Sequence, residues 1–578
     1  MTALFDAVAD WIADDPDPVT RDELAAVLEA AAGGDPAARA DLEDRFAGLL
    51  RFGTAGLRGA LGAGPNRMNL AVVVRAAAGI AGWIRDTAPD DGPRRGVAVC
   101  FDARHRSRDF AAATAEVLAA AGIRALLLPG PLPTPVLAFA VRHLGTAAGV
   151  MVTASHNPPQ DNGYKVYDGT GRQIVAPTDA HIAGIIDGIE RVATIGRTGP
   201  DDPGIVRLDG SIVDAYVAAA AAVGRRPEAR SITVAYTALH GVGAATFRRV
   251  LAAAGFAPAA EAAEQVEPDP DFPTVAFPNP EEPGALDLGL ATACAAGADL
   301  LLANDPDADR LGVAVADPRL GGRADPAGWR VLSGDEIGAV LAHHLLRDGA
   351  EAGDVVATTI VSSTLLGHLA AAAGAGLRET LTGFKWISRA AGPGERLRFG
   401  YEEALGFAVA PDLVADKDGI TAAVAVAEAA AVEAAAGRTL LHVLDDLARA
   451  HGVHRTGQWS ARAEGVDGMA RLAEAMAALR AEPPADLAGA PVRRVVDLAG
   501  GSAGLPPSDV LVLHLDGARV VVRPSGTEPK LKCYLEVVEP VAGDVDAAPD
   551  AALDAARAAA DRRLAALTGA IAAATGLG

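Results

Sequence analysis

The chain has 578 residues, and at roughly 100 to 200 residues per domain this length favours three to five domains over one. Its formal net charge of −23 argues against a general nucleic-acid binder, because neutralising a phosphate backbone requires clustered lysines and arginines. The acidity instead predicts good solubility.

The N-terminal segment, residues 1–24, is acidic and has no basic region before an apolar run. No stretch of about 18 uninterrupted apolar residues follows it. Cys100, Cys294 and Cys533 include no CxxC pair, which supports neither a disulfide framework nor a zinc site. We therefore expect a cytoplasmic protein that binds neither membranes nor nucleic acid.

Three segments share a pattern that predicts a β-loop-α-β unit, and they look like an internal repeat. They start near residues 96, 231 and 354, about 125 residues apart. Clusters of Pro, Gly and Asp near residues 200 and 322 predict linkers or exposed turns. After about residue 450 we expect a helical region, a strand pair and a helix at 549–567, which together predict a smaller α+β domain.

Lysine is scarce in this chain. The five lysines are Lys165, Lys385, Lys417, Lys530 and Lys532, and arginine supplies the other basic residues. A lysine retained in such a background suggests a position that needs a compact ammonium and not a planar guanidinium.

Ser155 lies in the segment TASHNPPQDNGYKVY, residues 153–167, after an apolar run and before two prolines. This context predicts a rigid loop that leaves a strand. The flanks lack the G-x-S-x-G elbow, which disfavours an α/β-hydrolase serine. From these residues alone, a serine and an asparagine that cap an ordinary turn remain an alternative.

The segment NDPDADR, residues 304–310, places Asp305, Asp307 and Asp309 after an apolar strand. These carboxylates can converge on one hard cation if the strand end curls into a loop, giving the oxygen ligands that Mg²⁺ prefers. An EF-hand is excluded because Arg310 occupies the position that needs Gly and Ala316 the one that needs Glu. A solvated acidic turn is the alternative.

The segment RPSGTEPKLK, residues 523–532, combines hydroxyls, two kinds of cation and a Gly-containing turn between two strands. Such groups can hold a dianion, and a simple hairpin turn would not explain the cations. Neither this loop nor RFGTAGLRG at 51–59 has the spacing of a nucleotide-binding P-loop. GYEEALGF at 400–407 and TGFKW at 382–386 carry groups that could bind sugar hydroxyls.

In this order, the motifs GTAGLRG, TASHNPPQDNGYKVY, DPDADR, TGFKW, GYEEALGF and RPSGTEPK resemble the α-D-phosphohexomutase superfamily of phosphoglucomutases and phosphomannomutases. The wording of EEALGF and TGFKW is most similar to the phosphoglucomutase-2-like subgroup, some of whose members act on pentose phosphates or make sugar bisphosphates. In place of the Glu-Glu-Ser of many members, this chain has Glu402-Glu403-Ala404, which leaves the sugar preference open.

The resemblance implies an α/β fold with three related α/β domains with mixed sheets, and a smaller α+β C-terminal domain, around a central cleft. We place a helical extension and the phosphoserine domain at 1–205. A metal-binding domain would follow at 206–320, a sugar-binding domain at 321–445 and a phosphate-binding domain at 446–578. The fourth domain could close the cleft against water.

The resemblance also implies roles for single residues. Ser155 would be the phosphoserine, and one Mg²⁺ would be held by Asp305, Asp307, Asp309 and an oxygen of the Ser155 phosphate. The groups near the transferring phosphoryl would be Arg58, Lys165 and His156, with His240 a further candidate. The substrate-binding residues would be Arg310, Thr382, Gly383, Lys385, Glu402, Arg523, Ser525, Gly526 and Thr527.

We therefore expect a phosphosugar mutase that interconverts hexose 1-phosphate and 6-phosphate through a phosphoserine, with a sugar 1,6-bisphosphate as intermediate and activator. It would act as a monomer or weak homodimer. A phosphopentomutase or a sugar-bisphosphate synthase using the same serine is the alternative. A phosphatase and a non-catalytic sugar-phosphate-binding protein also remain open.

Overall fold

The computed structural model describes residues 2–51, 56–462, 468–502, 504–525, 530–543 and 550–577. The chain divides into two compact units, each described by itself below. The first unit comprises Met1–Val331 and Gly406–Val432, and the second comprises Leu332–Leu405 and Glu433–Gly578. The chain therefore leaves the first unit, returns to it for 27 residues and leaves again.

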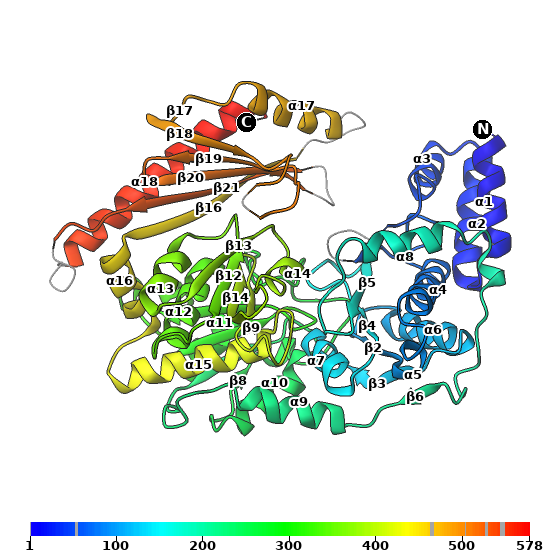
Figure 1. The fold of residues 1–578 in the computed structure, drawn as a ribbon, viewed down its shortest axis with the longest axis horizontal. Coiled ribbons are helices and arrows are strands. Elements are labelled where there is room, and N and C mark those ends of the chain that lie inside the picture. The colour runs from blue at the N-terminus through cyan, green and yellow to red at the C-terminus, as the bar shows by residue number, and fades with distance from the viewer. Residues whose placement is uncertain are drawn as a thin grey trace. The chain divides into compact units, whose positions relative to one another are not determined.

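The first unit begins with three helices, drawn in dark blue in Figure 1. They are α1 (Thr2–Asp14), α2 (Pro18–Ala32) and α3 (Pro36–Arg45). Asp17 and Asp35 cap α2 and α3 by accepting hydrogen bonds from backbone amides, and a proline follows each cap. Val8, Leu24 and Leu42 form the buried core between the three helices.

The next domain of the first unit is built on a six-stranded sheet with the order β1-β5-β4-β2-β3-β6. Strands β2, β3, β4 and β6 run parallel, whereas at one edge β5 pairs antiparallel with β4 and β1 pairs antiparallel with β5. The strands are β1 (Leu57–Ala60), β2 (Val97–Phe101), β3 (Ala125–Pro131), β4 (Ala148–Val152), β5 (Asp161–Asp168) and β6 (Ile205–Arg207). Every residue of β2 and β4 is buried, as expected for strands covered on both faces.

Helices cover both faces of this sheet. The helices are α4 (Leu70–Thr87), α5 (Gly92–Arg95), α6 (Ser107–Ala120), α7 (Thr134–Leu144), α8 (Thr178–Asp187) and the 3₁₀ turn η1 (Val192–Thr194). Helices α6 and α7 both contact β2 and β4, from opposite sides of the sheet (Figure 1). Helix α4 packs outside, against α6 and α8.

A second, five-stranded sheet in the first unit has the order β11-β10-β9-β7-β8. Strands β7, β8 and β9 run parallel, β10 pairs antiparallel with β9, and β11 pairs antiparallel with β10. The strands are β7 (Val234–Thr237), β8 (Ala260–Glu261), β9 (Leu300–Asn304), β10 (Leu311–Ala316) and β11 (Trp329–Val331). The helices are α9 (Ser211–Ala221), α10 (Gly243–Ala253), η2 (Ala263–Gln265), α11 (Asp287–Ala296), η3 (Pro318–Leu320) and η4 (Pro326–Gly328). The returning segment contains β15 (Gly406–Ala408), which is not a strand of this sheet, and most of α15 (Gly419–Ala435).

The second unit contains a parallel sheet and its helices. Strand β12 (Asp354–Thr359) pairs in parallel with β13 (Gly376–Thr380) on one side and with β14 (Arg396–Glu402) on the other. The helices are α12 (Gly334–Leu346), α13 (Leu365–Ala373), α14 (Phe384–Ile387) and α16 (Leu440–His451). Ser333 and Glu336 form a capping box at the start of α12.

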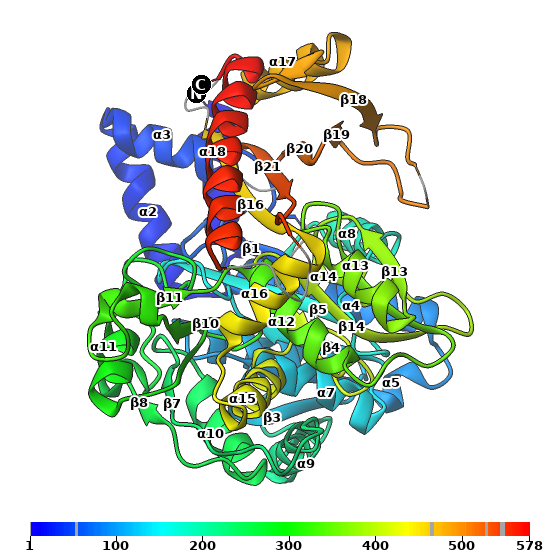
Figure 2. The same cartoon turned by 90° about the vertical axis from the view of Figure 1, so that its left-hand side faces the viewer.

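The C-terminal part of the second unit is a six-stranded antiparallel sheet with the order β16-β21-β20-β19-β18-β17. The strands are β16 (Val453–Arg462), β17 (Asp486–Leu487), β18 (Ala490–Asp497), β19 (Leu511–Leu515), β20 (Ala518–Pro524) and β21 (Lys530–Glu539). Helices α17 (Gly468–Ala481) and α18 (Asp550–Thr575) pack on one face, as Figure 2 shows for the red α18. On the other face, Val521 and Tyr534 pack with Ile360 and Val361.

The three β-loop-α-β segments expected from the sequence are confirmed as β2-α6-β3, β7-α10-β8 and β12-α13-β13. The strand pair expected after residue 450 is confirmed as β20 and β21, and helix α17 lies in the region expected to be helical. The other four strands of this sheet, β16 to β19, were not expected from the sequence. Strand β16 is largely polar and only partly buried, so it lacks the apolar run that announces a buried strand. The last helix extends beyond the expected 567 to Thr575.

Among the described residues, no single helix has both the length and the apolar composition needed to cross a membrane. A bent pair, α15 with α16, passes that test by length and composition only.

Candidate functional site

Ser155 lies in the loop after β4, in a conformation that is unusual for a serine. Its φ is 54°, in the left-handed region that side-chain-bearing residues rarely adopt. Its amide donates a hydrogen bond to the Thr153 hydroxyl at 2.9 Å. Its own hydroxyl donates to Asp305 Oδ2 at 2.7 Å and lies 3.3 Å from His156 Nδ1. The loop therefore aims the serine hydroxyl at the first of the three predicted metal ligands.

Arg104 holds the serine loop in this conformation. Its buried guanidinium donates to the carbonyls of Ser155 at 2.7 Å, Pro158 at 2.8 Å and Asp161 at 3.2 Å, and also to that of Asn157. One rigid, planar cation thus gathers four carbonyls that would otherwise need water. Arg104 lies outside the motifs identified from the sequence, about 50 residues before the loop that it holds.

The three predicted metal ligands converge in the loop between β9 and β10. Asp305, Asp307 and Asp309 are all buried, and a ligand oxygen from each lies within 4.8 Å of the other two. A neighbouring loop fixes their spacing, because the Val242 amide donates to the Pro306 carbonyl at 2.8 Å. The solvated acidic turn considered from the sequence is therefore excluded.

Cations from distant segments surround the carboxylates. Lys165 Nζ, on β5, lies 2.7 Å from Asp307 Oδ2 and 2.8 Å from Asp309 Oδ2. Lys417 Nζ, in the returning segment, lies 3.4 Å from Asp309 Oδ2. Arg310 Nε is 4.0 Å from Asp309 Oδ1. The sequence analysis gave Lys417 no role, although its scarcity as a residue type was the signal that could have found it.

These contacts set the charges of the carboxylates. Burial, with the negative charges of Asp307 and Asp309, raises the pKa of Asp305 well above its usual range. Burial alone would also raise the pKa of Asp309, but the ammonium groups of Lys165 and Lys417 lower it instead. The cluster therefore pairs a carboxyl group that resists ionisation with one that is held ionised.

The donor set fits a hard divalent cation. Asp307 Oδ1 and Asp309 Oδ1 are buried and make no hydrogen bond within the described part of the chain. Buried carboxylate oxygens without a donor are costly unless a cation or water satisfies them. Asp307 Oδ2 is already satisfied by Lys165 and by the Thr134 hydroxyl at 2.6 Å. An all-oxygen set of this kind suits Mg²⁺.

Arg58 and His156 lie beside the serine loop, whereas His240 does not take part. Arg58 Nη1 donates to the Asn157 side-chain oxygen at 3.0 Å. Burial, with the positive charges of Arg310 and Arg58, lowers the pKa of His156 well below its usual range, so this imidazole is neutral. His240 Nε2 instead lies 2.8 Å from the Thr274 hydroxyl.

The second unit contains the other predicted substrate-binding residues. Arg523 Nη1, on β20, donates to the Thr382 hydroxyl at 2.6 Å, which joins two of the predicted motifs. Gly383 has a φ of 108°, and the buried Lys385 Nζ lies 5.9 Å from the ring centre of Trp386.

The remaining predicted residues of this unit lie in two places. Glu402 ends β14 and is 8% exposed. The Ser525 amide donates to the Lys530 carbonyl at 2.7 Å and so closes the β20–β21 loop. Gly526 and Thr527 lie outside the described residues.

Glu403, the second of the two adjacent carboxylates in the GYEEALGF motif, has a pKa shifted toward neutral pH. Burial, then the charges of Glu402 and Asp335, raise its pKa to about 7. Its carboxylate accepts hydrogen bonds from the Ser362 hydroxyl at 3.0 Å and the Thr359 hydroxyl at 3.1 Å. A carboxyl group that titrates near neutral pH beside a predicted sugar ligand is a candidate functional group.

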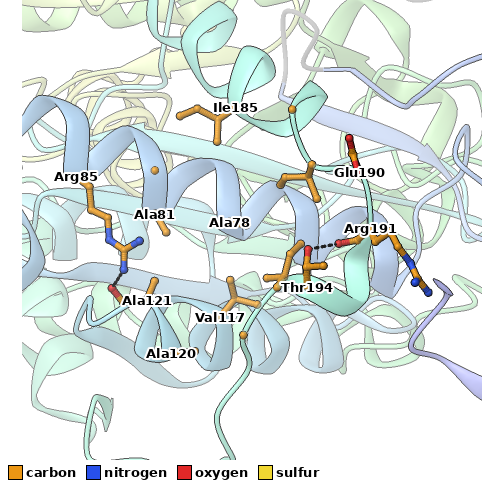
Figure 3. A pocket seen from close by; sticks show the side chains of 15 residues that line it. Ala78, Ala81, Arg85, Val117, Ala120, Ala121, Ile185, Glu190, Arg191 and Thr194 are labelled. Atoms are coloured by element: carbon orange, nitrogen blue, oxygen red, sulfur yellow. Dashed lines mark hydrogen bonds between the residues drawn. The ribbon is translucent and has the colours of Figure 1, made fainter.

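A surface hollow of about 670 Å³ lies away from these residues, between α4, α6 and the segment after α8. Figure 3 shows that small apolar side chains, including Ala78, Ala81 and Val117, line the hollow. At one end of it, the Arg85 guanidinium donates a hydrogen bond to the Ala121 carbonyl. None of the predicted site residues lines this hollow.

Comparison with known proteins gave four consecutive family matches. The matched families are phosphoglucomutase/phosphomannomutase alpha/beta/alpha domain I at residues 49–193, domain II at 214–321, domain III at 333–450 and the C-terminal domain at 463–544.

Individual relatives are similar over most of the chain. A probable phosphomannomutase from Haemophilus influenzae is 42% identical over 475 residues, covering 81% of this chain and 93% of that protein. The human phosphopentomutase is 33% identical over 577 residues, covering 92% and 91%. The crystal structure of a putative phosphomannomutase from Thermus thermophilus superposes with a TM-score of 0.64 at 26% identity, covering 89% of this chain and 99% of that one.

The close approach of the loop at Gly241 to the aspartate loop can be tested by mutation. A Cβ atom at Gly241 would lie 2.3 Å from Pro306 Cα, so Gly241→Ala must displace the loop that carries the carboxylates. We expect a loss of about 1–3 kcal/mol in the free energy of unfolding, measured by urea denaturation. Gly210→Ala is the control, because Gly210 has a φ of −68° and no atom within 4 Å of its Cβ position. Equal stabilities of the two variants would contradict the proposed close packing.

The raised pKa of Glu403 predicts a pH-dependent stability. The folded-state pKa is about 7 against a usual value of 4.5, so the stability gained from the neutral carboxyl is fully present below pH 4.5. It is lost as the pH rises through 7. Between pH 5 and 8.5 the wild type should therefore lose on the order of 3 kcal/mol relative to Glu403→Gln in urea denaturation. A difference that stays constant with pH would refute the raised pKa.

Proposed function

Because the chain belongs to the phosphoglucomutase/phosphomannomutase family, we propose that it interconverts hexose 1-phosphate and 6-phosphate through a phosphorylated Ser155. Family members of this kind are phosphomutases, isomerases that move a phosphoryl group within one molecule. The observation that supports Ser155 most directly is its hydroxyl, 2.7 Å from Asp305 Oδ2 beside three buried carboxylates and Lys165. No other described serine lies in that position.

Charge explains why the serine needs this setting. A phosphoserine carries about −1.5 to −2 at neutral pH, and the substrate brings a second phosphate close to it. Arg58 and Lys165 supply fixed positive charge around the transferring group. His156, being neutral and 3.3 Å from the serine hydroxyl, can accept or return a proton there.

One Mg²⁺ would be held by Asp305, Asp307, Asp309 and an oxygen of the Ser155 phosphate. When bound, this ion would offset the negative charge that develops during phosphoryl transfer. The two donor-free buried oxygens described above support this assignment.

The residues proposed to bind the substrate fall into two groups. Arg310, Thr382, Gly383, Lys385 and Glu402 would contact the sugar, because they offer cations and acceptors to its hydroxyls. Arg523, Ser525, Gly526 and Thr527 would hold the phosphate that is not being transferred.

The proposed reaction consists of two successive phosphoryl transfers. First the bond from Ser155 Oγ to phosphorus breaks, a bond from the free sugar hydroxyl to phosphorus forms, and the hydroxyl proton returns to the serine oxygen. The sugar 1,6-bisphosphate then reverses in the site, and its other phosphate passes back to Ser155. The same bisphosphate, added from outside, acts as the activator that phosphorylates an unmodified enzyme.

Pentose phosphates form a second candidate substrate class, favoured by the similarity to human phosphopentomutase over 92% of this chain. We also propose the domain limits 1–205, 206–320, 321–445 and 446–578, a cytoplasmic location and a monomer or weak homodimer. The four matched families each fall largely within one of these proposed domains.

The phosphoserine is tested by Ser155→Ala. In ³¹P NMR, wild type with Mg²⁺ and trace bisphosphate should convert glucose or mannose 1-phosphate to the 6-phosphate, or ribose 1-phosphate to the 5-phosphate. Ser155→Ala should lose roughly 10³-fold or more of this rate, because the covalent step is gone. The exposed Ser211→Ala is the control and should match the wild type. Release of inorganic phosphate, or no conversion by the wild type, would instead favour a phosphatase or a binding protein.

The metal site is tested by Asp307→Asn. Replacing a charged ligand oxygen by an amide should raise the Mg²⁺ concentration for half-maximal rate roughly tenfold or more, and Mn²⁺ binding followed by electron paramagnetic resonance should weaken in parallel. Asp271→Asn, at a carboxylate that is 72% exposed, is the matched control. Equal Mn²⁺ affinities of the two variants would rule out Asp307 as a ligand.

A further inference from the structure

The last residue of β12 and the loop that follows it, residues 359–364, are held from two directions within the second unit. The loop is hydroxyl-rich, with the sequence TIVSST, and the serines and threonines at its two ends are buried or nearly so. It leaves the carboxyl end of a parallel strand, the end at which ligands of α/β sheets bind. Neither the family matches nor the motifs singled out from the sequence assign this loop a role.

Glu403 holds the loop from the sugar side. Its Oε2 atom accepts from the hydroxyls of Thr359 and Ser362, which are themselves 2.8 Å apart. Glu403 directly follows Glu402, the proposed sugar ligand at the end of β14. Since β14 runs parallel to β12, the carboxylate of Glu403 ties the ends of two adjacent strands together.

Arg519 and Glu536 hold the same loop from the phosphate side. Arg519 Nη2, on β20, donates to the Ser362 carbonyl at 2.5 Å and lies 3.2 Å from Glu536 Oε2. Glu536, opposite Arg519 on β21, accepts from the Ser363 hydroxyl and the Thr364 amide, both at 2.8 Å. Both side chains are buried, at 9% and 3% exposure, so these contacts are shielded from solvent.

Strand β20 carries the proposed phosphate ligand as well. Arg523 lies four residues after Arg519, and side chains at even spacing on a strand point to the same face. Arg519 reaches Ser362 and Arg523 reaches Thr382, so one face of one strand contacts both the hydroxyl-rich loop and the TGFKW segment.

We infer that Glu403 and Arg519 are positioning residues that clamp Ser362 between the sugar-contacting end of β14 and the phosphate-binding strand β20. Glu403 holds the side chain of Ser362 and Arg519 holds its carbonyl, so a displacement at one end is transmitted to the other. The groups proposed to bind the two ends of a phosphosugar are then coupled to each other through Ser362. This inference rests on the proposed function of Glu402 and Arg523.

The clamp explains a requirement of the proposed cycle. The sugar bisphosphate must bind in two orientations, and in each the distance between the sugar-binding and phosphate-binding groups has to be the same. Small errors in such a distance are costly, because misplacement by about 1 Å can lower a rate roughly 100-fold.

The test compares Glu403→Ala, Arg519→Met and the double variant with wild type. Inorganic phosphate affinity, measured by calorimetry, reports phosphate binding without any sugar contact, and the KM and kcat for glucose 1-phosphate report the sugar and phosphate contacts together. We expect Glu403→Ala to weaken inorganic phosphate binding roughly tenfold although Glu403 lies on the sugar side. The effects of the two single changes should not add in the double variant. Arg493→Met, at an exposed strand cation paired with Asp516, is the control and should change neither quantity.

Hydrogen exchange provides a readout that does not depend on activity. Glu403→Ala should speed amide exchange in residues 518–525, and Arg519→Met should speed it in residues 359–364. Glu403→Gln, which keeps an acceptor for the two hydroxyls, should restore most of the protection. Additive effects, or exchange that rises only next to each mutated residue, would overturn the clamp. If wild type shows no mutase activity but the exchange effects appear, the proposed function fails while the clamp stands.

Discussion

Three carboxylates buried within 4.8 Å of one another impose the constraint on which the first unit depends. Removing even one carboxylate from water costs several kcal/mol unless it is compensated, and mutual repulsion adds to that cost. The compensation comes from Lys165 and Lys417, with Arg310 at greater distance. These cations come from three separate parts of the chain, so the site forms only when the first unit has folded. The electrostatics of the cluster and the tertiary structure are therefore mutually dependent.

The need for cations around the aspartates is met in part by a segment that returns to the first unit late in the chain. The segment 406–432 leaves the second unit and returns to the first, where Lys417 approaches Asp309. The residues on either side of Lys417 are also held by hydrogen bonds. Asp416 accepts one from the Tyr167 hydroxyl at 2.9 Å, and Asp418 accepts one from the Tyr216 hydroxyl. A residue that follows the proposed sugar-binding motif in sequence thus lies at the proposed phosphoryl-transfer site. The order of motifs along the chain is not the order of functions in space.

The sequence was most informative where the candidate functional side chains lie close together in one loop. The spacing of the aspartates and the prolines after Ser155 are local patterns, and both loops occupy the strand ends expected for them. Arg104, Thr134 and Lys417 were missed because each acts on a partner more than 50 residues away, and no local pattern encodes such a contact. Strand β16 was missed for a related reason, since an open, polar strand has no apolar periodicity to reveal it.

The second unit illustrates how hydroxyl-rich loops acquire order. A loop of small polar side chains has little apolar surface to bury, so its conformation must be set by hydrogen bonds. Here Glu403 and Glu536 accept hydrogen bonds from the loop, and Arg519 donates one to it. Asp335 accepts a further hydrogen bond from the Ser363 amide at 2.7 Å. Each of these side chains belongs to a different element. Hydrogen bonds between polar side chains therefore fix the conformation of this loop, as apolar packing does in a hydrophobic core.

The left-handed backbone at Ser155 decides which hydroxyl-bearing residue can occupy that position. Threonine offers the same oxygen, but its branched Cβ fits poorly at a φ of 54°, whereas serine fits with much less strain. The backbone, and not the chemistry of the hydroxyl group, thus favours serine over threonine at this position. A Ser155→Thr exchange would therefore strain this loop even if every side chain around it stayed in place.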